Sequence, residues 1–279
     1  MHPIMESPAK PLVGTPPLFL PMRWCIATLL FCVLFVGFAF RVLLSITIGS
    51  IGEEYGYTNP QKGLALGAFF LGYVLLQVPG ALLAGRYGGW SVLLASSALS
   101  TLGILVTPIC ARESFGALVF ARFLTGLGQG PFIPVTHALI LHWAPRAESS
   151  TFVGFIWSAT SLGIGLALPA SGAIIAAAYG PSTTSHPHIV VGWEGVFYVW
   201  GFVGVGVTAL WAVLGASSPA LHMLTSSEER KYIESTREPV GRADATVPWA
   251  RLLVHRAIVA MTVAHLCHNW ICYLLLAWL

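Results

Sequence analysis

The chain has 279 residues, of which 56% are hydrophobic and 9% are charged, and its formal net charge is +3. This composition excludes a soluble globular domain and predicts an all-α membrane protein that crosses the bilayer several times. The positive charge is too small and too scattered for a nucleic-acid partner, so we expect none.

Residues 1–23 are rich in proline and lack the charged start and cleavage site of a signal peptide, so we expect a tail there. Apolar runs of about 20 residues predict the membrane spans that follow. They lie near 24–49, 62–84, 91–110, 115–142, 151–178, 195–215 and 257–279. The sequence therefore predicts a six-helix bundle over 24–215, a central loop over 216–256 and a seventh helix, 257–279, in which the chain stops as a fragment.

The basic residues of the connections predict the orientation. Ten of them lie on the side of the tail and the central loop, and only Lys62 and Arg112 lie on the other side. Because cytoplasmic loops carry the excess of Lys and Arg, we expect the tail and the central loop to be cytoplasmic. Within the loop, the spacing of Ser226 and Glu229 predicts a capping box and a short helix through Ile233, and we interpret the loop's charges as a solvated face.

Arg122 is the only charged residue between about Phe115 and Trp143. An arginine at bilayer depth costs roughly 2.5–3.5 kcal/mol, so something must offset it. Thr125 and Gln129 share its helical face, while Gly126 and Gly130 lie on an adjoining face where another helix can approach closely. We interpret the segment as one wall of a polar cavity that receives an anion. An arginine that caps carbonyl groups or pairs with a structural acid is the alternative.

Arg41 lies inside the first predicted span, at a depth similar to that of Arg122. With a rise of about 1.5 Å per residue, both arginines lie roughly 10–12 Å from the outer ends of their helices. None of the eleven acids falls inside a predicted span. Two guanidinium groups at one level repel each other unless an anion lies between them, and arginine binds carboxylate or phosphate well. An acid supplied by sequence beyond this chain is the alternative partner.

Other polar residues inside spans are candidates for lining the cavity. Gln77 precedes Pro79, which, like Pro169, is expected to kink or open its helix. His265 and His268, three residues apart on one helical face, could carry a proton or line the cavity, and His137 is a further cavity candidate. For a histidine in a membrane span, bonding to a neighbouring carbonyl is as good an explanation. The five cysteines show neither a disulfide framework nor zinc spacing. No catalytic carboxylate pair, nucleophile triad or metal cluster lies at membrane depth, so we expect no enzyme activity, no metal site and no cofactor.

Motifs in the chain resemble the major facilitator superfamily, in particular its anion:cation symporter branch, which includes sialin and vesicular glutamate and sodium/phosphate transporters. The resemblance covers nearly everything from Trp24 to the end. It rests on residues that keep their order and spacing: Gly72-Tyr73, Gln77 to Gly80, Ala84 to Gly89, Arg122, Gly126, Gly130, Pro134, His137, Trp143 to Pro145, Glu148-Ser149, Leu168-Pro169, Gly192-Trp193, Glu228 to Arg230, Pro248-Trp249, Ala264 to Cys267 and Asn269-Trp270.

The resemblance implies two six-helix bundles with alternating access, of which this chain holds the N-terminal bundle, the central loop and the seventh helix. It also implies that Arg41 and Arg122 face the substrate path and that Gly80, Arg86 and Gly88 belong to a conformational switch. At four positions the chain departs from the family pattern: Gln129 replaces a glutamate linked to coupling, Gly85 an aspartate, Trp90 a basic residue, and Leu66 a histidine of the glutamate transporters.

Together these features predict a secondary active transporter of small organic anions or inorganic phosphate, with a proton or sodium as the coupling ion and the lipid bilayer as its environment. The expected substrate-binding residues are Arg41, Arg122, Gln77, Thr125, Gln129, His137 and His268. A membrane sensor or scaffold that does not transport, or a truncated product without activity, is the alternative.

Overall fold

The computed structural model describes residues 21–179, 192–237 and 254–278, and it is helical throughout these ranges apart from short connections. The chain divides into two units, Met1–Val240 and Gly241–Leu279, which are described separately below. The predicted tail up to residue 20 and residues 238–253 of the predicted central loop lie outside the described residues.

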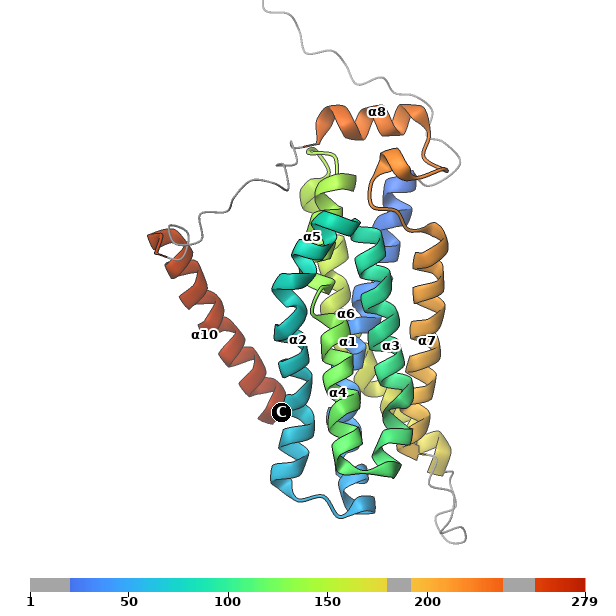
Figure 1. The fold of residues 1–279 in the computed structure, drawn as a ribbon, viewed down its shortest axis with the longest axis vertical. Coiled ribbons are helices and arrows are strands. Elements are labelled where there is room, and N and C mark those ends of the chain that lie inside the picture. Colours follow the sequence, from blue (N-terminus) through green and yellow to red (C-terminus); the bar gives the residue numbers. More distant parts are fainter. Residues whose placement is uncertain (1–20, 180–191, 238–253, 279) are drawn as a thin grey trace, which may run out of the picture. The chain divides into compact units, whose positions relative to one another are not determined.

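The first unit is a bundle of long helices that run side by side, with one short helix lying across an end (Figure 1). The long elements are α1 (Met22–Tyr55), α2 (Asn59–Tyr87), α3 (Gly89–Glu113), α4 (Phe115–Gln129), α5 (Phe132–Trp143), α6 (Ser149–Tyr179) and α7 (Gly192–Leu214). A 3-10 turn, η1 (Pro219–Leu221), and α8 (Ser227–Thr236) follow. Five of the described helices, α1, α2, α3, α6 and α7, are long and apolar enough to cross a membrane. The all-α membrane fold expected from the sequence is confirmed.

The predicted single span 115–142 is wrong in one respect, because the structure divides it into α4 and α5. The break falls at Gly130-Pro131, where Pro131 has no N–H to donate to the preceding turn. Both residues keep right-handed helical dihedral angles, φ −49° and ψ −48° at Gly130 and φ −71° and ψ −15° at Pro131. Pro79 and Pro169, where kinks were expected, lie inside the uninterrupted helices α2 and α6.

Glycines bring α2 and α4 into backbone contact. A Cβ atom on Gly126 would collide with the carbonyl of Phe69 in α2, and one on Gly72 would collide with the carbonyl of Phe123 in α4. At Gly130 a Cβ would lie 2.7 Å from the Tyr73 carbonyl oxygen. The close helix approach predicted from Gly126 and Gly130 is therefore confirmed, and α2 is the helix that approaches.

At the end of the bundle where α3 finishes and α7 begins, Arg112 and Glu194 form a bidentate pair. Arg112 Nε and Nη2 donate to the two carboxylate oxygens of Glu194 at 2.8 and 2.7 Å. Glu194 is buried in the first turn of α7, and Glu53, Glu54 and Glu113 lie in the last turns of α1 and α3, so the expectation that every acid lies outside the spans is wrong at these helix ends. Helix α7 begins three residues earlier than predicted, and the Glu194 carboxylate is neutralised by Arg112.

At the opposite end, α8 is held against the bundle by charged side chains. Arg23 donates two hydrogen bonds of 3.0 Å to Glu148 and one of 3.2 Å to Glu229. Glu229 also accepts from the backbone N–H groups of Met22 and Arg23 at 3.0 and 3.1 Å, which satisfies the start of α1. For Glu229, the interpretation of the loop charges as a solvated face is therefore wrong.

Of the capping box predicted at the start of α8, the structure shows the bond to the Ser226 hydroxyl but not the returning bond to the Glu229 carboxylate. The Ser226 hydroxyl accepts from the N–H of Glu229 at 3.1 Å, as an N-cap should. The Glu229 side chain does not complete a capping box, because it reaches α1 instead. The helix ends at Thr236, three residues beyond the predicted end.

The second unit contains α10 (Arg256–Trp278), which matches the predicted seventh helix at 257–279 to within one residue at each end. Its described side chains at Met261, Leu266 and Trp270 are exposed within the chain.

Candidate functional site

Arg41 in α1 and Arg122 in α4 are brought together in the interior of the bundle. Arg122 Nη2 lies 3.5 Å from the backbone carbonyl oxygen of Arg41, at the limit of a hydrogen bond. Arg122 is 1% exposed, whereas Arg41 is half-buried and forms the more accessible edge of the pair. The similar depth predicted for the two arginines is confirmed by this contact.

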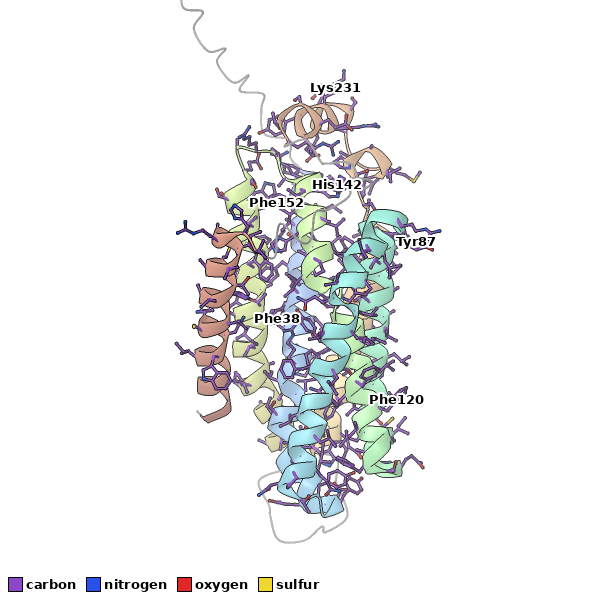
Figure 2. All side chains as sticks on the ribbon, turned by 60° about the vertical axis from the view of Figure 1, so that its left-hand side comes forward. Phe38, Tyr87, Phe120, His142, Phe152 and Lys231 are labelled. Carbon is purple, nitrogen blue, oxygen red and sulfur yellow. The ribbon has the colours of Figure 1, made fainter. Side chains whose placement is uncertain are left out.

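Aromatic rings surround the two guanidinium groups. The Phe69 ring is shared, with its centroid 5.5 Å from Cζ of Arg41 and 5.6 Å from Cζ of Arg122. Phe38 and Tyr73 add rings at 4.1 and 4.7 Å from Cζ of Arg41. Figure 2 shows Phe38 partway along the length of the bundle, far from Lys231, which lies at one end. Each ring offsets part of the cost of burying a cation, by about 0.5–2 kcal/mol.

Gln129, two turns after Arg122, completes the polar group. Its Oε1 accepts a hydrogen bond of 3.1 Å from Arg41 Nε. Four buried nitrogens in this group have no hydrogen-bond partner among the described residues: Arg41 Nη2, Arg122 Nε, Arg122 Nη1 and Gln129 Nε2. No described acid forms an ion pair with either arginine. A buried donor left without a partner costs about 1–3 kcal/mol, so the group is arranged to bind an acceptor.

The structure does not bring the other predicted residues into this group in the same way. The Thr125 hydroxyl donates to the Ala121 carbonyl at 2.9 Å and lies against Gly103 of α3. Gln77 is half-buried on α2, beside the end of α4 at Gly130. Their roles in binding stay predictions.

The two predicted histidines belong to different units. His137 in α5 is exposed and packs against Trp157 of α6, with ring centroids 5.1 Å apart. His268 lies in α10, in the second unit, so any part it plays beside the arginines stays a prediction.

Two of the three predicted switch residues, Arg86 and Gly88, lie at the turn between α2 and α3, and Gly80 lies seven residues before the end of α2. Gly80 packs against Pro131 at the α4–α5 break, and Arg86 is exposed with its guanidinium 5.4 Å from the Tyr87 ring. Gly88 has a φ of 85°, which favours glycine, and a Cβ there would lie 2.7 Å from Ser217 Oγ. The turn therefore packs on the segment after α7, and its role as a switch stays a prediction.

Trp90, found where the family pattern has a basic residue, ties the same turn to α7. Its indole N–H donates to the carbonyl of Trp211 at 3.1 Å, and the Trp211 indole N–H donates to the carbonyl of Trp90 at 3.2 Å. These reciprocal bonds are a local link within the first unit.

Sequence reasoning missed the aromatic residues around the arginines, although two signals were present. Phe38 precedes Arg41 by three residues and Phe69 precedes Tyr73 by four, and both spacings place side chains on one helical face. The pairing of those two faces depends on the packing of α1 against α2 and α4, which no local pattern contains.

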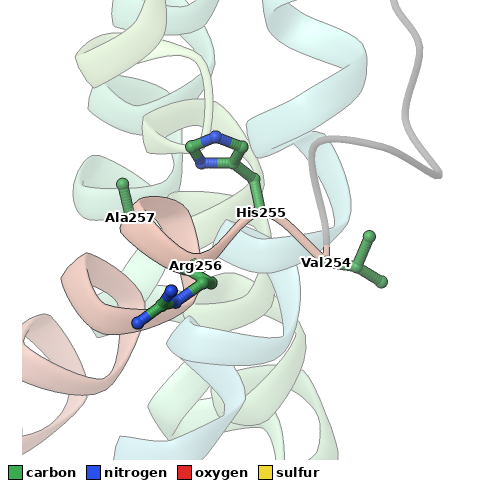
Figure 3. Close-up of a pocket in the computed structure, with 4 residues that line it drawn as sticks. All are labelled: Val254, His255, Arg256 and Ala257. Carbon is green, nitrogen blue, oxygen red and sulfur yellow. The ribbon is translucent and has the colours of Figure 1, made fainter.

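The second unit has a pocket of its own at the start of α10, lined by Val254, His255, Arg256 and Ala257 (Figure 3). All four residues are consecutive in the chain, and the exposed His255 and Arg256 are its polar members. Since a binding site needs polar groups that converge from several elements, we assign no function to this pocket.

Comparison with known proteins bears on the same residues. The sequence model of the Major Facilitator Superfamily matches residues 29–279. Sialin of Ovis aries is 33% identical over 225 residues, which cover 81% of this chain and 43% of that protein. Vesicular glutamate transporter 1 of Bos taurus is 31% identical over 280 residues, covering 92% and 47%. The chloroplastic sodium-dependent phosphate transport protein 1 of Arabidopsis thaliana is 30% identical over 262 residues, covering 93% and 48%.

Among solved structures, a variant of the fucose:proton symporter FucP of E. coli shares the fold. The TM-score is 0.52 at 16% sequence identity, and the match covers 84% of this chain and 57% of that one. The chain spans about half the length of the curated relatives it matches. The match to the superfamily and the identity to these relatives, together with the long apolar helices, show that the chain is a multi-pass membrane protein that belongs to the anion:cation symporter branch of the major facilitator superfamily.

Proposed function

We propose that this chain supplies the anion-binding bundle of a secondary active transporter for small organic anions or inorganic phosphate. The observation that carries the proposal is the buried arginine pair, Arg41 and Arg122, whose free N–H donors face no described acid. Positive charge of this kind is costly inside a membrane and is expected where a substrate or ion passes.

The relatives' names agree in chemical class. They include a vesicular glutamate transporter, an ascorbate transporter of Arabidopsis thaliana and a sodium-dependent phosphate transport protein, all of which name small anions. Alternating access of two bundles, coupling to a proton or sodium, and cytoplasmic placement of the tail and of α8 belong to the same proposal. The positive-inside distribution of basic residues supports that orientation.

The proposal also explains why Arg41 is half-buried while Arg122 is enclosed. An anion that enters beside the half-buried Arg41 would reach its free Nη2, which is itself buried in this conformation, once the site opens. It would then reach the enclosed donors of Arg122, exchanging a hydration shell for several charge-assisted hydrogen bonds. Arginine suits this role because its donors form a fixed fork that matches carboxylate and phosphate oxygens.

Uptake in proteoliposomes by the complete two-bundle transporter to which we assign this chain tests the proposal. We expect uptake of at least one of radiolabelled glutamate, ascorbate and phosphate, with and without a sodium gradient, and loss of that uptake on Arg122→Gln. Arg230→Gln is the matched control, because Arg230 lies exposed on α8 and pairs only with Glu234 among the described residues. Retained uptake in the Arg122→Gln protein would refute the role of the arginine pair. Anion binding without uptake would favour the sensor or scaffold.

A further inference from the structure

We infer that Gln129 makes this site selective for oxyanions that carry no proton, such as a carboxylate, over hydrogen phosphate. The inference rests on the proposed function and narrows its substrate class. It follows from which polar atoms near the two arginines donate hydrogen bonds, which accept them, and which already have a partner.

The orientation of the Gln129 amide is fixed by its neighbour. Arg41 Nε can only donate, so the Gln129 atom 3.1 Å away must be the accepting oxygen, Oε1. The remaining atom, Nε2, is therefore a donor, and it is buried without a partner in a side chain that is 0% exposed. Gln129 thus adds a free N–H donor beside the two arginines, while its oxygen already accepts a hydrogen bond from Arg41.

A census of the group shows that donors outnumber acceptors. The unpartnered atoms of Arg41, Arg122 and Gln129 are four N–H-bearing nitrogens. Gln129 Oε1 and the Arg41 carbonyl already receive one bond each, from Arg41 Nε and Arg122 Nη2, and the Tyr73 ring beside Arg41 carries a hydroxyl that can donate or accept. The fifth unpartnered buried atom is the hydroxyl oxygen of Thr136 on α5, and a hydroxyl can either donate or accept.

This arrangement distinguishes anions by their protons. A carboxylate or sulfate presents only acceptor oxygens, which match a set of N–H donors. Inorganic phosphate near neutral pH keeps at least one P–OH group, and that group needs an acceptor. If the P–OH group is buried against N–H donors, its own hydrogen has no acceptor and one N–H of the site loses the oxygen it would have bound. This loss corresponds to at least about tenfold in affinity.

Sulfate and phosphate make the sharpest pair of probes, because both are tetrahedral and of similar size and they differ in the proton. Titration of each anion into the protein in lipid nanodiscs, followed by calorimetry at constant ionic strength at pH 8, where phosphate is mainly the dianion and matches sulfate in charge, measures the affinity ratio. We expect sulfate to bind at least about tenfold more tightly than phosphate. Equal affinity, or tighter binding of phosphate, would overturn the inference and leave the proposed function standing. If sulfate, phosphate and glutamate all failed to bind, both would fall.

Gln129→Glu tests the residue itself, because it replaces the free donor by a group that can accept. We expect the preference for sulfate to shrink about tenfold or to invert in favour of phosphate. Gln61→Glu is the matched control: Gln61 lies in the first turn of α2, where its Oε1 accepts from Thr58 N–H, and a glutamate can keep that bond. An unchanged ratio in Gln129→Glu would show that Gln129 does not set the preference. The ratio measured on the parent protein needs no variant and decides the inference if the variant fails to fold.

Discussion

Replacing Arg122 by methionine should make the protein more stable while removing its ability to bind an anion. Methionine has a similar length and no charge, so it fills the same space without the cost of a buried cation. A structural arginine would behave in the opposite way, because its removal would leave the groups that it holds without a partner. The direction of the change in stability therefore separates the two roles of Arg122.

The magnitude follows from the contacts. An arginine at bilayer depth costs roughly 2.5–3.5 kcal/mol. Against this, Arg122 has one ring, Phe69 with its centroid 5.6 Å from Cζ, worth about 0.5–1 kcal/mol. It also has one hydrogen bond of 3.5 Å to the Arg41 carbonyl, worth about 0.5 kcal/mol. The net expectation for Arg122→Met is a gain of about 2 kcal/mol, or about 4–8 °C in Tm.

Thermal unfolding in lipid nanodiscs, with and without added anion, measures both effects. The parent protein should gain stability on addition of an anion that it binds, and Arg122→Met should not respond. Arg41→Met is the informative comparison: it loses two closer rings and the bond to Gln129, so no gain in stability is expected. Arg230→Met, on the surface of α8, should change neither quantity. A lower Tm for Arg122→Met, with the anion response intact, would refute the reasoning.

Three further predictions concern the framework of the site. Gly126→Ala should destabilise the protein by about 1–3 kcal/mol, because its Cβ would meet the Phe69 carbonyl, whereas Gly165→Ala on α6 has open space and should be neutral or stabilising in the same unfolding assay. Glu229→Ala should speed amide hydrogen exchange in α8 about tenfold, since its carboxylate holds that helix to the first residues of α1; unaltered exchange in α8 would contradict this contact. Burial raises the pKa of the Tyr232 phenol, so the folded state favours the protonated phenol. The stability that this adds is lost as the pH rises through that raised pKa. Difference absorbance of the parent protein against Tyr232→Phe should therefore show a titration midpoint above the usual value for tyrosine.

The sequence was sufficient to predict the membrane fold and the meeting of the two arginines. Apolar runs of bilayer length are a local signal, and a rise of about 1.5 Å per residue converts position into depth. Depth alone predicted that Arg41 and Arg122 lie at one level, and the bond from Arg122 to the Arg41 carbonyl confirms it.

The features that the sequence did not reveal depend on contacts between distant segments. Glu229 has the spacing of a capping box, yet its carboxylate binds backbone groups 206 and 207 residues away. The break between α4 and α5 was missed because apolar residues predominate on both sides of it and Gly130 and Pro131 keep helical dihedral angles. The direction of the Thr125 hydroxyl, toward its own backbone and α3, is decided by helix packing and not by its place on the face of Arg122.

The glycine contacts between α2 and α4 have a consequence for motion. Backbone atoms of Phe69, Tyr73 and Phe123 occupy the space that side chains would fill, so neither helix has a smooth surface along which the other could slide. Shear is a small sliding of packed helices, and here it would push side chains next to each glycine onto these backbone atoms. The two helices, and the Phe69 ring that both guanidinium groups share, should therefore travel as one rigid piece, and any opening of the site must come from hinges at its boundaries.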